Sequence, residues 1–100
     1  MNLNDLKLGI LGGGQLGKML CLAASNWNLD TSVLDPSFDC PSALVATSFY
    51  KGDFANFDDV YKFGNTVDIL TIEIEHVNVE ALIKLKEKGL EISPAPEIIA

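Results

Sequence analysis

The sequence predicts an α/β fold with a Rossmann-like, doubly wound parallel sheet of about five strands, and three observations support this. The apolar residues Leu8, Ile10 and Leu11 lead into three consecutive glycines, and a helical pattern of apolar residues follows. Residues 69–72 are apolar on both faces, as a strand in the middle of a parallel sheet should be. Strand and helix patterns also alternate along the chain, which is typical of a parallel sheet covered by helices.

The first half of the chain contains the glycine-rich turn and three predicted strands. Asp35-Pro36 ends the second strand, because proline cannot donate a hydrogen bond to the sheet and disfavours helix at the residue before it. The predicted elements are a strand at 7–11, a helix at 14–26, a strand at 31–34, one helical turn at 43–46 and a strand at 48–50.

The second half of the chain is predicted to contain two helices with clear end signals. Asp53 is the expected N-cap of the first helix and Gly64 follows its last turn, whereas Asn78 and Gly89 bound the second in the same way. The predicted elements are a helix at 54–63, a strand at 67–74, a helix at 79–88, a strand at 90–92 and a further helix opened by 93–94.

Length and composition indicate one globular domain. The chain has 100 residues, of which 48% are hydrophobic, enough for a single core. No apolar run approaches the ~20 residues of a membrane span, and the N-terminus lacks a signal-peptide pattern, so a cytoplasmic location is expected. We expect residues 1–100 to form one domain and, because the last predicted helix is incomplete, to be a fragment of a longer protein.

The charge pattern restricts the partners of this chain. A net charge of −7 disfavours binding to nucleic acid and to anionic membranes. The seven Lys and Arg residues are all lysines, so no guanidinium is present to hold a phosphate in bidentate fashion. A phosphate bound here must therefore rest on backbone N–H groups, with Lys18 as a candidate partner.

The sequence shows no complete catalytic or metal-binding constellation, so we expect no catalytic residue and no metal site. Cys21 and Cys40 lack the spacing of metal ligands, and a disulfide is not expected. Cys21 lies in an apolar helical pattern and should be a buried apolar residue. His76 has no partner nearby in the sequence, which favours a structural or solvent-exposed position over a catalytic one.

The glycine-rich stretch is the strongest candidate site. Gly12, Gly14 and Gly17 have the spacing G-x-G-x-x-G, in which glycines turn the chain, let a ligand approach the backbone and let the helix pack closely on the strand. The bare helix N-terminus offers N–H groups and the positive end of the helix dipole to an anion, usually a phosphate. The alternative is that these glycines only close a tight turn.

Carboxylates are expected opposite this glycine loop. Ligands of parallel sheets bind beyond the carboxyl ends of the strands, where the sequence places Asp35, Glu73 and Glu75. Asp35 has the position of a ribose-binding acid in dinucleotide folds, or else it is a turn residue before Pro36. Glu73 and Glu75 share one face of a strand and either flank a ligand or are solvated charges. Together with the loop they suit a phosphorylated sugar.

The chain resembles a known family from about residue 7 to residue 100. The matching segments are ILGGGQLGKML at 10–20, VLDP at 33–36, a Pro-rich loop around Asp39, GDF at 52–54 and TIEIEHV at 71–77. Together they are similar to the N-terminal, pre-ATP-grasp domain of 5-(carboxyamino)imidazole ribonucleotide synthase, the ATPase subunit of phosphoribosylaminoimidazole carboxylase, in the ATP-grasp superfamily. A formate-using transformylase has a similar glycine loop, so the loop alone does not identify the family. The resemblance is specific because the loop occurs together with the E-x-E-x-V pattern at 73–77.

The resemblance implies a ligase of purine biosynthesis. In that family ATP activates bicarbonate to carboxyphosphate, and the amine of aminoimidazole ribonucleotide takes up the carboxyl group. ATP, Mg²⁺ and the basic residues that clamp the substrate phosphate would be bound or supplied outside this chain, and the full-length enzyme is expected to be a homodimer. The residues expected to bind the ribonucleotide are Gly13, Gly14, Gln15, Leu16 and Glu73, with Asp35 and Glu75 as further candidates.

Two other functions remain as alternatives. An NAD(P)-binding domain of an oxidoreductase would explain the glycine spacing and Asp35, and a non-catalytic flavodoxin-like module would explain the acidic strand ends. Gln15 and Glu73 argue against the first, because a dinucleotide domain does not need a polar loop side chain beside a carboxylate of the fourth strand. Three consecutive glycines would be unusual in the second.

Overall fold

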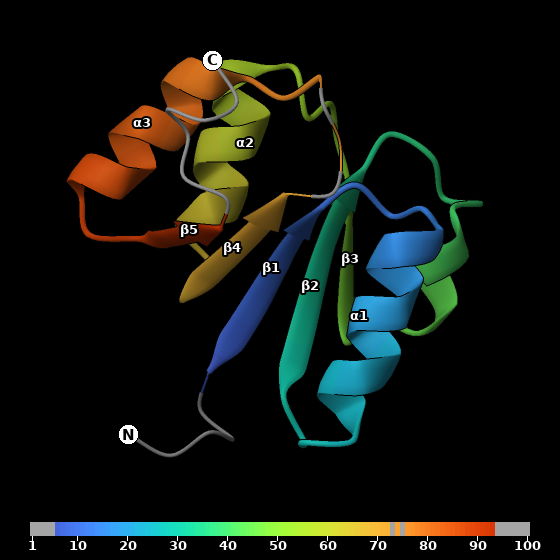
Figure 1. Cartoon of the computed structure of the whole chain (residues 1–100). Coiled ribbons are helices and arrows are strands. Elements are labelled where there is room, and N and C mark those ends of the chain that lie inside the picture. Colours follow the sequence, from blue (N-terminus) through green and yellow to red (C-terminus); the bar gives the residue numbers. More distant parts are fainter. Residues whose placement is uncertain (1–5, 73, 75, 94–100) are drawn as a thin grey trace.

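The computed structural model describes residues 6–72, 74 and 76–93. They form a five-stranded, all-parallel sheet in the order β3-β2-β1-β4-β5, with helices on both sides (Figure 1). This confirms the predicted doubly wound α/β fold. The elements in chain order are β1 (Lys7–Leu11), α1 (Gln15–Ser25), β2 (Asp30–Asp35), the 3₁₀-helix η2 (Pro41–Leu44), β3 (Ser48–Lys51), α2 (Phe57–Gly64), β4 (Ile69–Ile72), α3 (Val79–Glu87) and β5 (Glu91–Ser93).

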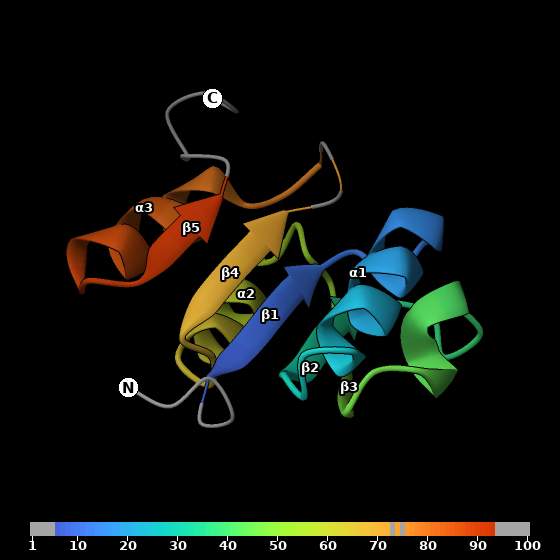
Figure 2. The same ribbon diagram turned by 60° about the horizontal axis from the view of Figure 1, so that its bottom comes forward.

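Different helices cover the two faces of the sheet (Figures 1 and 2). α1 and η2 contact each other on one face, and α2 and α3 pack together on the other. The core under α1 is small and contains the buried residues Ile10, Cys21 and Val33. The larger core under α2 and α3 includes Leu11 and Leu34 from the same two strands. Adjacent residues of β1 and β2 are therefore buried on opposite faces, as expected for central parallel strands.

Asparagine side chains set the starts of α2 and α3. The Oδ1 atom of Asn56 accepts a hydrogen bond from the N–H of Asp59 at 3.0 Å, so Asn56 is the N-cap of α2. The prediction that Asp53 caps this helix was wrong, because Oδ1 of Asp53 instead accepts from the N–H of Ala55 at 2.8 Å and forms a turn ahead of the helix. Asn78 caps α3 as predicted.

Other boundaries also differ from the predictions, several of them by a single residue. The helical turn expected at 43–46 lies at Pro41–Leu44, because the fixed φ of proline suits the first turn of a helix. β4 spans Ile69–Ile72 and is shorter than expected, and Gly64 is the last residue of α2 rather than the residue after it. The helix expected from 93–94 onward falls on residues outside the described part of the chain. None of the described helices is long and apolar enough to cross a membrane.

Candidate functional site

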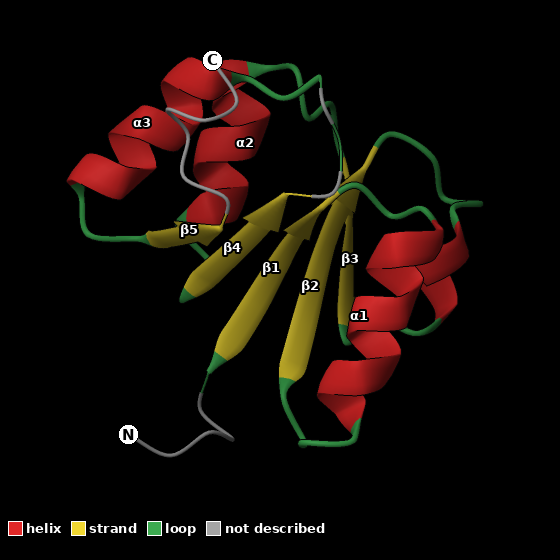
Figure 3. Ribbon diagram, viewed as in Figure 1, coloured by secondary structure: helices red, strands yellow, loops and turns green. Residues whose placement is uncertain are grey.

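The segments that leave the carboxyl ends of β1, β2 and β4 come from one edge of the sheet (Figure 3). β1 leads to α1 on one face and β4 leads to α3 on the other, although the two strands are neighbours. Parallel sheets bind ligands at such a switch point. The glycine loop, residues 12–14, and the segment that follows β4 flank this position.

The glycines of the loop have different surroundings. Gly12 has a φ of 102°, a backbone conformation that residues other than glycine rarely adopt. A Cβ at this position would also lie 2.6 Å from Cγ2 of Ile74. A Cβ on Gly17 would lie 2.6 Å from the carbonyl oxygen of Gly12, so α1 packs directly on the loop. A Cβ on Gly14 would meet no described atom within 4 Å. The loop is thus closely packed at Gly12 and Gly17 and open at Gly14.

The N-terminus of α1 has no side-chain cap. Gly14 is the N-cap and makes no side-chain hydrogen bond, and the first turn contains no acidic residue. Gln15 and Leu16 are both exposed at this end. Because the first N–H groups of a helix have no partner within the helix, this end presents donors and a positive dipole to an anion or another strong acceptor.

Both carboxylate oxygens of Asp35 accept hydrogen bonds from backbone N–H groups, and one of these groups belongs to the glycine loop. Oδ2 accepts from the N–H of Gly13 at 2.8 Å, and Oδ1 accepts from the N–H of Ser37 at 2.9 Å. The bond to Ser37 is a turn of the kind that the sequence offered as one interpretation of Asp35; the bond to Gly13 was not foreseen. In a dinucleotide site the corresponding acid faces the ribose, whereas here both oxygens already face backbone N–H groups.

Ser42 is a residue of this region that the sequence analysis did not identify. It lies in η2, is 0% exposed, and donates to the carbonyl oxygen of Gly13 from its N–H at 2.9 Å and from Oγ at 3.0 Å. A Cβ on Gly13 would lie 2.6 Å from that Oγ and 2.5 Å from Sγ of Cys40. The contact joins residues 29 positions apart, so no local sequence pattern signals it.

The segment after β4 lies beside the glycine loop. Glu73 and Glu75 are outside the described residues, but Ile74, between them, packs against Gly12. His76 is exposed, in agreement with the position expected from the sequence. Among the described residues, the structure therefore brings together the glycine loop, Asp35 and Ile74.

The cysteines form neither a disulfide nor part of a metal site among the described residues. Both are free, and Cys21 is 1% exposed. Cys21 packs with Ile10 and Val33 and is a buried apolar residue, as predicted, and this burial raises the pKa of its thiol. In the described part of the chain, no three His, Cys, Asp or Glu residues are grouped so that they could hold a metal ion.

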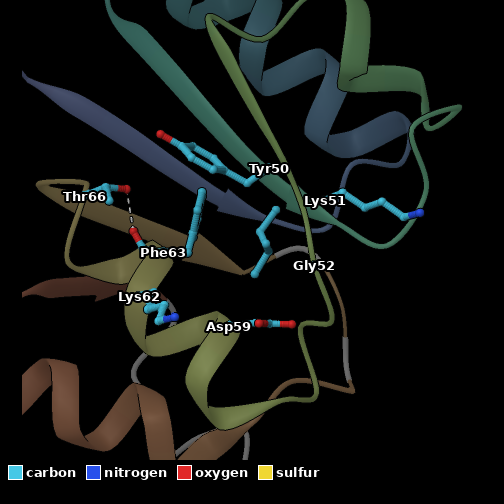
Figure 4. Close-up of a pocket in the computed structure, with 8 residues that line it drawn as sticks. Tyr50, Lys51, Gly52, Asp59, Lys62, Phe63 and Thr66 are labelled. Carbon is cyan, nitrogen blue, oxygen red and sulfur yellow. Dashed lines mark hydrogen bonds between the residues drawn. The ribbon is translucent and has the colours of Figure 1, made fainter.

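A cavity of about 290 Å³ lies elsewhere, between β3 and α2 (Figure 4). Its lining includes Tyr50 and Phe63, whose rings meet edge to face with centroids 5.6 Å apart, and no residue of the glycine loop. The one carboxylate that lines it, Asp59, accepts from the N–H of Asp53 at 2.9 Å, and Lys51 points away from the aromatic pair, over the ring of Phe38. We place the candidate site at the glycine loop instead, because that loop lies at the switch point of the sheet, where parallel sheets bind ligands.

Relatives of this chain carry two enzyme names, phosphoribosylaminoimidazole carboxylase and N5-carboxyaminoimidazole ribonucleotide synthase. Phosphoribosylaminoimidazole carboxylase of Candida albicans is 45% identical over 95 residues, which are 92% of this chain and 17% of the relative. N5-carboxyaminoimidazole ribonucleotide synthase of Staphylococcus aureus is 39% identical over 92 residues, 88% of this chain and 25% of the relative. The chain thus spans between about a sixth and a quarter of the length of these curated relatives.

Solved structures match the whole fold. N5-carboxyaminoimidazole ribonucleotide synthetase of Thermotoga maritima has a TM-score of 0.89 at 35% identity, over 94% of this chain and 26% of that one. A glycinamide transformylase of Mycobacterium tuberculosis has a TM-score of 0.86 at 16% identity, over 93% of this chain and 27% of that one, and shows the fold alone. The model of the ribonucleotide synthetase preATP-grasp domain matches residues 6–100. The chain therefore belongs to the ribonucleotide synthetase preATP-grasp domain family.

Proposed function

We propose that this chain is the N-terminal, substrate-binding domain of an ATP-dependent ligase that carboxylates 5-aminoimidazole ribonucleotide with bicarbonate in de novo purine biosynthesis. The observation that carries this proposal is the open N-terminus of α1 at the switch point of the sheet, beside the segment around Ile74. Relatives with the matching enzyme name support it.

The glycine loop would bind the ribonucleotide through its backbone. The missing side chain at Gly14 leaves space for the ligand, and the N–H groups at the start of α1 suit its electronegative atoms. The exposed amide of Gln15 can both donate and accept hydrogen bonds. We assign direct substrate contacts to Gly14, Gln15 and Leu16. Gly13, whose N–H and carbonyl oxygen are already hydrogen-bonded, contributes by shaping the loop.

The carboxylates would recognise the uncharged, hydrogen-donating parts of the ribonucleotide. Glu73 accepts from its amine or hydroxyl groups, and Glu75 is a second acceptor from the same segment. Asp35 contributes by holding the N–H of Gly13, and its oxygens have further lone pairs for a ligand hydroxyl.

In the proposed reaction the ribonucleotide amine forms a C–N bond with the carbonyl carbon of carboxyphosphate. The C–O bond to the phosphate breaks, inorganic phosphate leaves, and the amine loses a proton. The role of this chain is to hold the amine in the position for attack, which lowers the entropic cost of the step.

We propose that ATP and Mg²⁺ bind outside this chain. Structures of related enzymes have been solved with nucleotides, from S. aureus with ADP and from Aspergillus clavatus with ATP. Mg²⁺, when bound with ATP, would neutralise phosphate charge during phosphoryl transfer. We assign none of the described residues of this chain to either.

We further propose that the enzyme is a cytoplasmic homodimer. The exposed apolar side chains Leu16, Met19 and Leu22 follow one side of α1 and are available for contact with other parts of the protein. Two free cysteines agree with a reducing compartment. The relative from Vigna aconitifolia is named chloroplastic.

The proposal is tested by incubating the full-length protein with ATP, Mg²⁺, ¹³C-bicarbonate and aminoimidazole ribonucleotide. We expect ADP release that depends on the ribonucleotide, together with ¹³C incorporation into a carbamate visible by NMR. If folded, nucleotide-binding protein releases no ADP in response to the ribonucleotide, the proposed activity is wrong.

A further inference from the structure

We infer that Ser42 is a positioning residue of the ribonucleotide site, which acts by fixing the peptide group between Gly13 and Gly14. This inference rests on the proposed function, and it adds a residue from η2 that lies outside the glycine-loop motif. Ser42 does not need to touch the ligand to have this effect.

The backbone of Gly13 is held on both sides of its Cα. Its N–H donates to Asp35 at 2.8 Å, and its carbonyl oxygen accepts from the N–H and from Oγ of Ser42 at 2.9 and 3.0 Å. Ser42 is 0% exposed, so no solvent competes for its hydroxyl. Three hydrogen bonds therefore fix the two peptide groups that meet at Gly13.

The geometry of the peptide group transmits this restraint to the binding surface. The carbonyl of Gly13 and the N–H of Gly14 belong to one planar, trans unit and point in opposite directions. Because the carbonyl points toward Ser42, the N–H of Gly14 points away from η2. Gly14 is also exposed, and a Cβ on it would meet no described atom within 4 Å. Ser42 thereby sets the direction of the first N–H group at the open helix end.

The same contact explains the middle glycine of the triplet, which the G-x-G-x-x-G spacing leaves unassigned. Gly13 does not have the positive φ of Gly12. A Cβ at Gly13 would instead lie 2.6 Å from Oγ of Ser42 and 2.5 Å from Sγ of Cys40. Glycine at this position lets the loop approach η2 closely enough for the two Ser42 bonds to form.

The test is Ser42→Ala in the full-length protein, with two readouts. We expect the affinity for aminoimidazole ribonucleotide, measured by calorimetry, to fall by about five- to tenfold, the range for loss of one neutral hydrogen bond that preorganises a site. We also expect faster hydrogen–deuterium exchange in peptides covering residues 12–16 of the ligand-free protein. Asp35→Asn, at a half-buried position, weakens the hydrogen bond to the N–H of Gly13 and should also raise the exchange rate of these peptides.

Thr31→Val is the matched control. Thr31 is 2% exposed, and its Oγ1 accepts from the N–H of Thr47 at 3.2 Å, near the amino end of β2 and so at the opposite edge of the sheet. This substitution also removes one buried hydroxyl and its hydrogen bond to the backbone. We expect it to leave both the ribonucleotide affinity and the exchange of residues 12–16 unchanged.

The outcomes separate the two proposals. If the unmodified protein does not bind the ribonucleotide, the proposed function fails, and the exchange measurement alone decides whether Ser42 holds the loop. If it binds and Ser42→Ala changes neither affinity nor exchange, the inference about Ser42 is overturned. Equal losses of affinity in Ser42→Ala and Thr31→Val also overturn it, because the effect would then be one of stability. If Ser42→Ala does not fold, Ser42→Cys replaces it, because a thiol is a much weaker donor than a hydroxyl, and unchanged exchange and affinity in that variant overturn the inference.

Discussion

One added methyl group should have different effects at Gly17 and Gly14: a loss of stability at Gly17 and a loss of ribonucleotide affinity at Gly14. Within a helix, replacing Gly by Ala ordinarily stabilises by about 1 kcal/mol. At Gly17, however, the new Cβ would lie 2.6 Å from the carbonyl oxygen of Gly12, below the 3.0 Å that real Cβ contacts respect. Because both atoms are fixed to backbone, we expect a cost near the upper end of the roughly 1–3 kcal/mol typical of overpacking. The net loss for Gly17→Ala is then about 2 kcal/mol, or a Tm lower by about 8–16 °C.

Gly14→Ala adds the same methyl group where no described atom lies within 4 Å. We expect the stability to change by less than about 1 kcal/mol, the scale of an altered N-cap. The ribonucleotide affinity should nevertheless fall by at least about tenfold, or 1.4 kcal/mol, because the methyl group occupies the space through which the ligand approaches the backbone.

Circular dichroism during heating measures the first effect, and calorimetric titration of the full-length protein with aminoimidazole ribonucleotide measures the second. A Gly17→Ala variant as stable as the unmodified protein would refute the argument from close packing. A Gly14→Ala variant with unchanged affinity would show that the ligand does not lie against this part of the loop.

Three further predictions concern other residues and ligands. Glu73→Gln in the full-length enzyme should lower kcat/KM for the ribonucleotide by at least about tenfold with little change in the KM for ATP, since a hydrogen bond to a charged acceptor contributes roughly 1.5–3 kcal/mol. Glu91→Gln, at an exposed position of β5, is the control, and equal small effects of the two substitutions would count against a role for Glu73. NAD and NADP should show no saturable binding at millimolar concentration by saturation-transfer NMR, whereas micromolar affinity would favour the oxidoreductase alternative. Because burial raises the pKa of the Cys21 thiol, iodoacetamide at pH 8 should modify Cys40 well before Cys21, and equal rates by mass spectrometry would contradict the buried position.

The order and type of the elements could be predicted from local pattern, because glycines, prolines and apolar runs mark the ends of strands and helices here. The start of α2 could not, since Asp53 and Asn56 are both good caps and the choice depends on Asp59, whose carboxylate accepts from the N–H of Asp53 while its own N–H donates to Asn56. These two hydrogen bonds of Asp59, to different residues, become visible only in the three-dimensional structure.

The candidate site could likewise be predicted only in part. The glycine loop and the carboxyl ends of the strands were predictable, because the motif is contiguous and the fold places those ends at one edge. The restraint on Gly13 was not, because it depends on Asp35 and Ser42, which lie 22 and 29 positions away. Residues that support a binding loop from a distance carry no local signal of their own.

We expect the ribonucleotide to bind at the glycine-loop end of α1, at the switch point between β1 and β4. A crystal structure of the full-length protein with aminoimidazole ribonucleotide tests it most directly. We expect ligand contacts to the backbone at Gly14 and Leu16 and to the side chains of Gln15 and Glu73. Ligand density in the cavity beside Tyr50 and Phe63, or anywhere that leaves the start of α1 untouched, would contradict it.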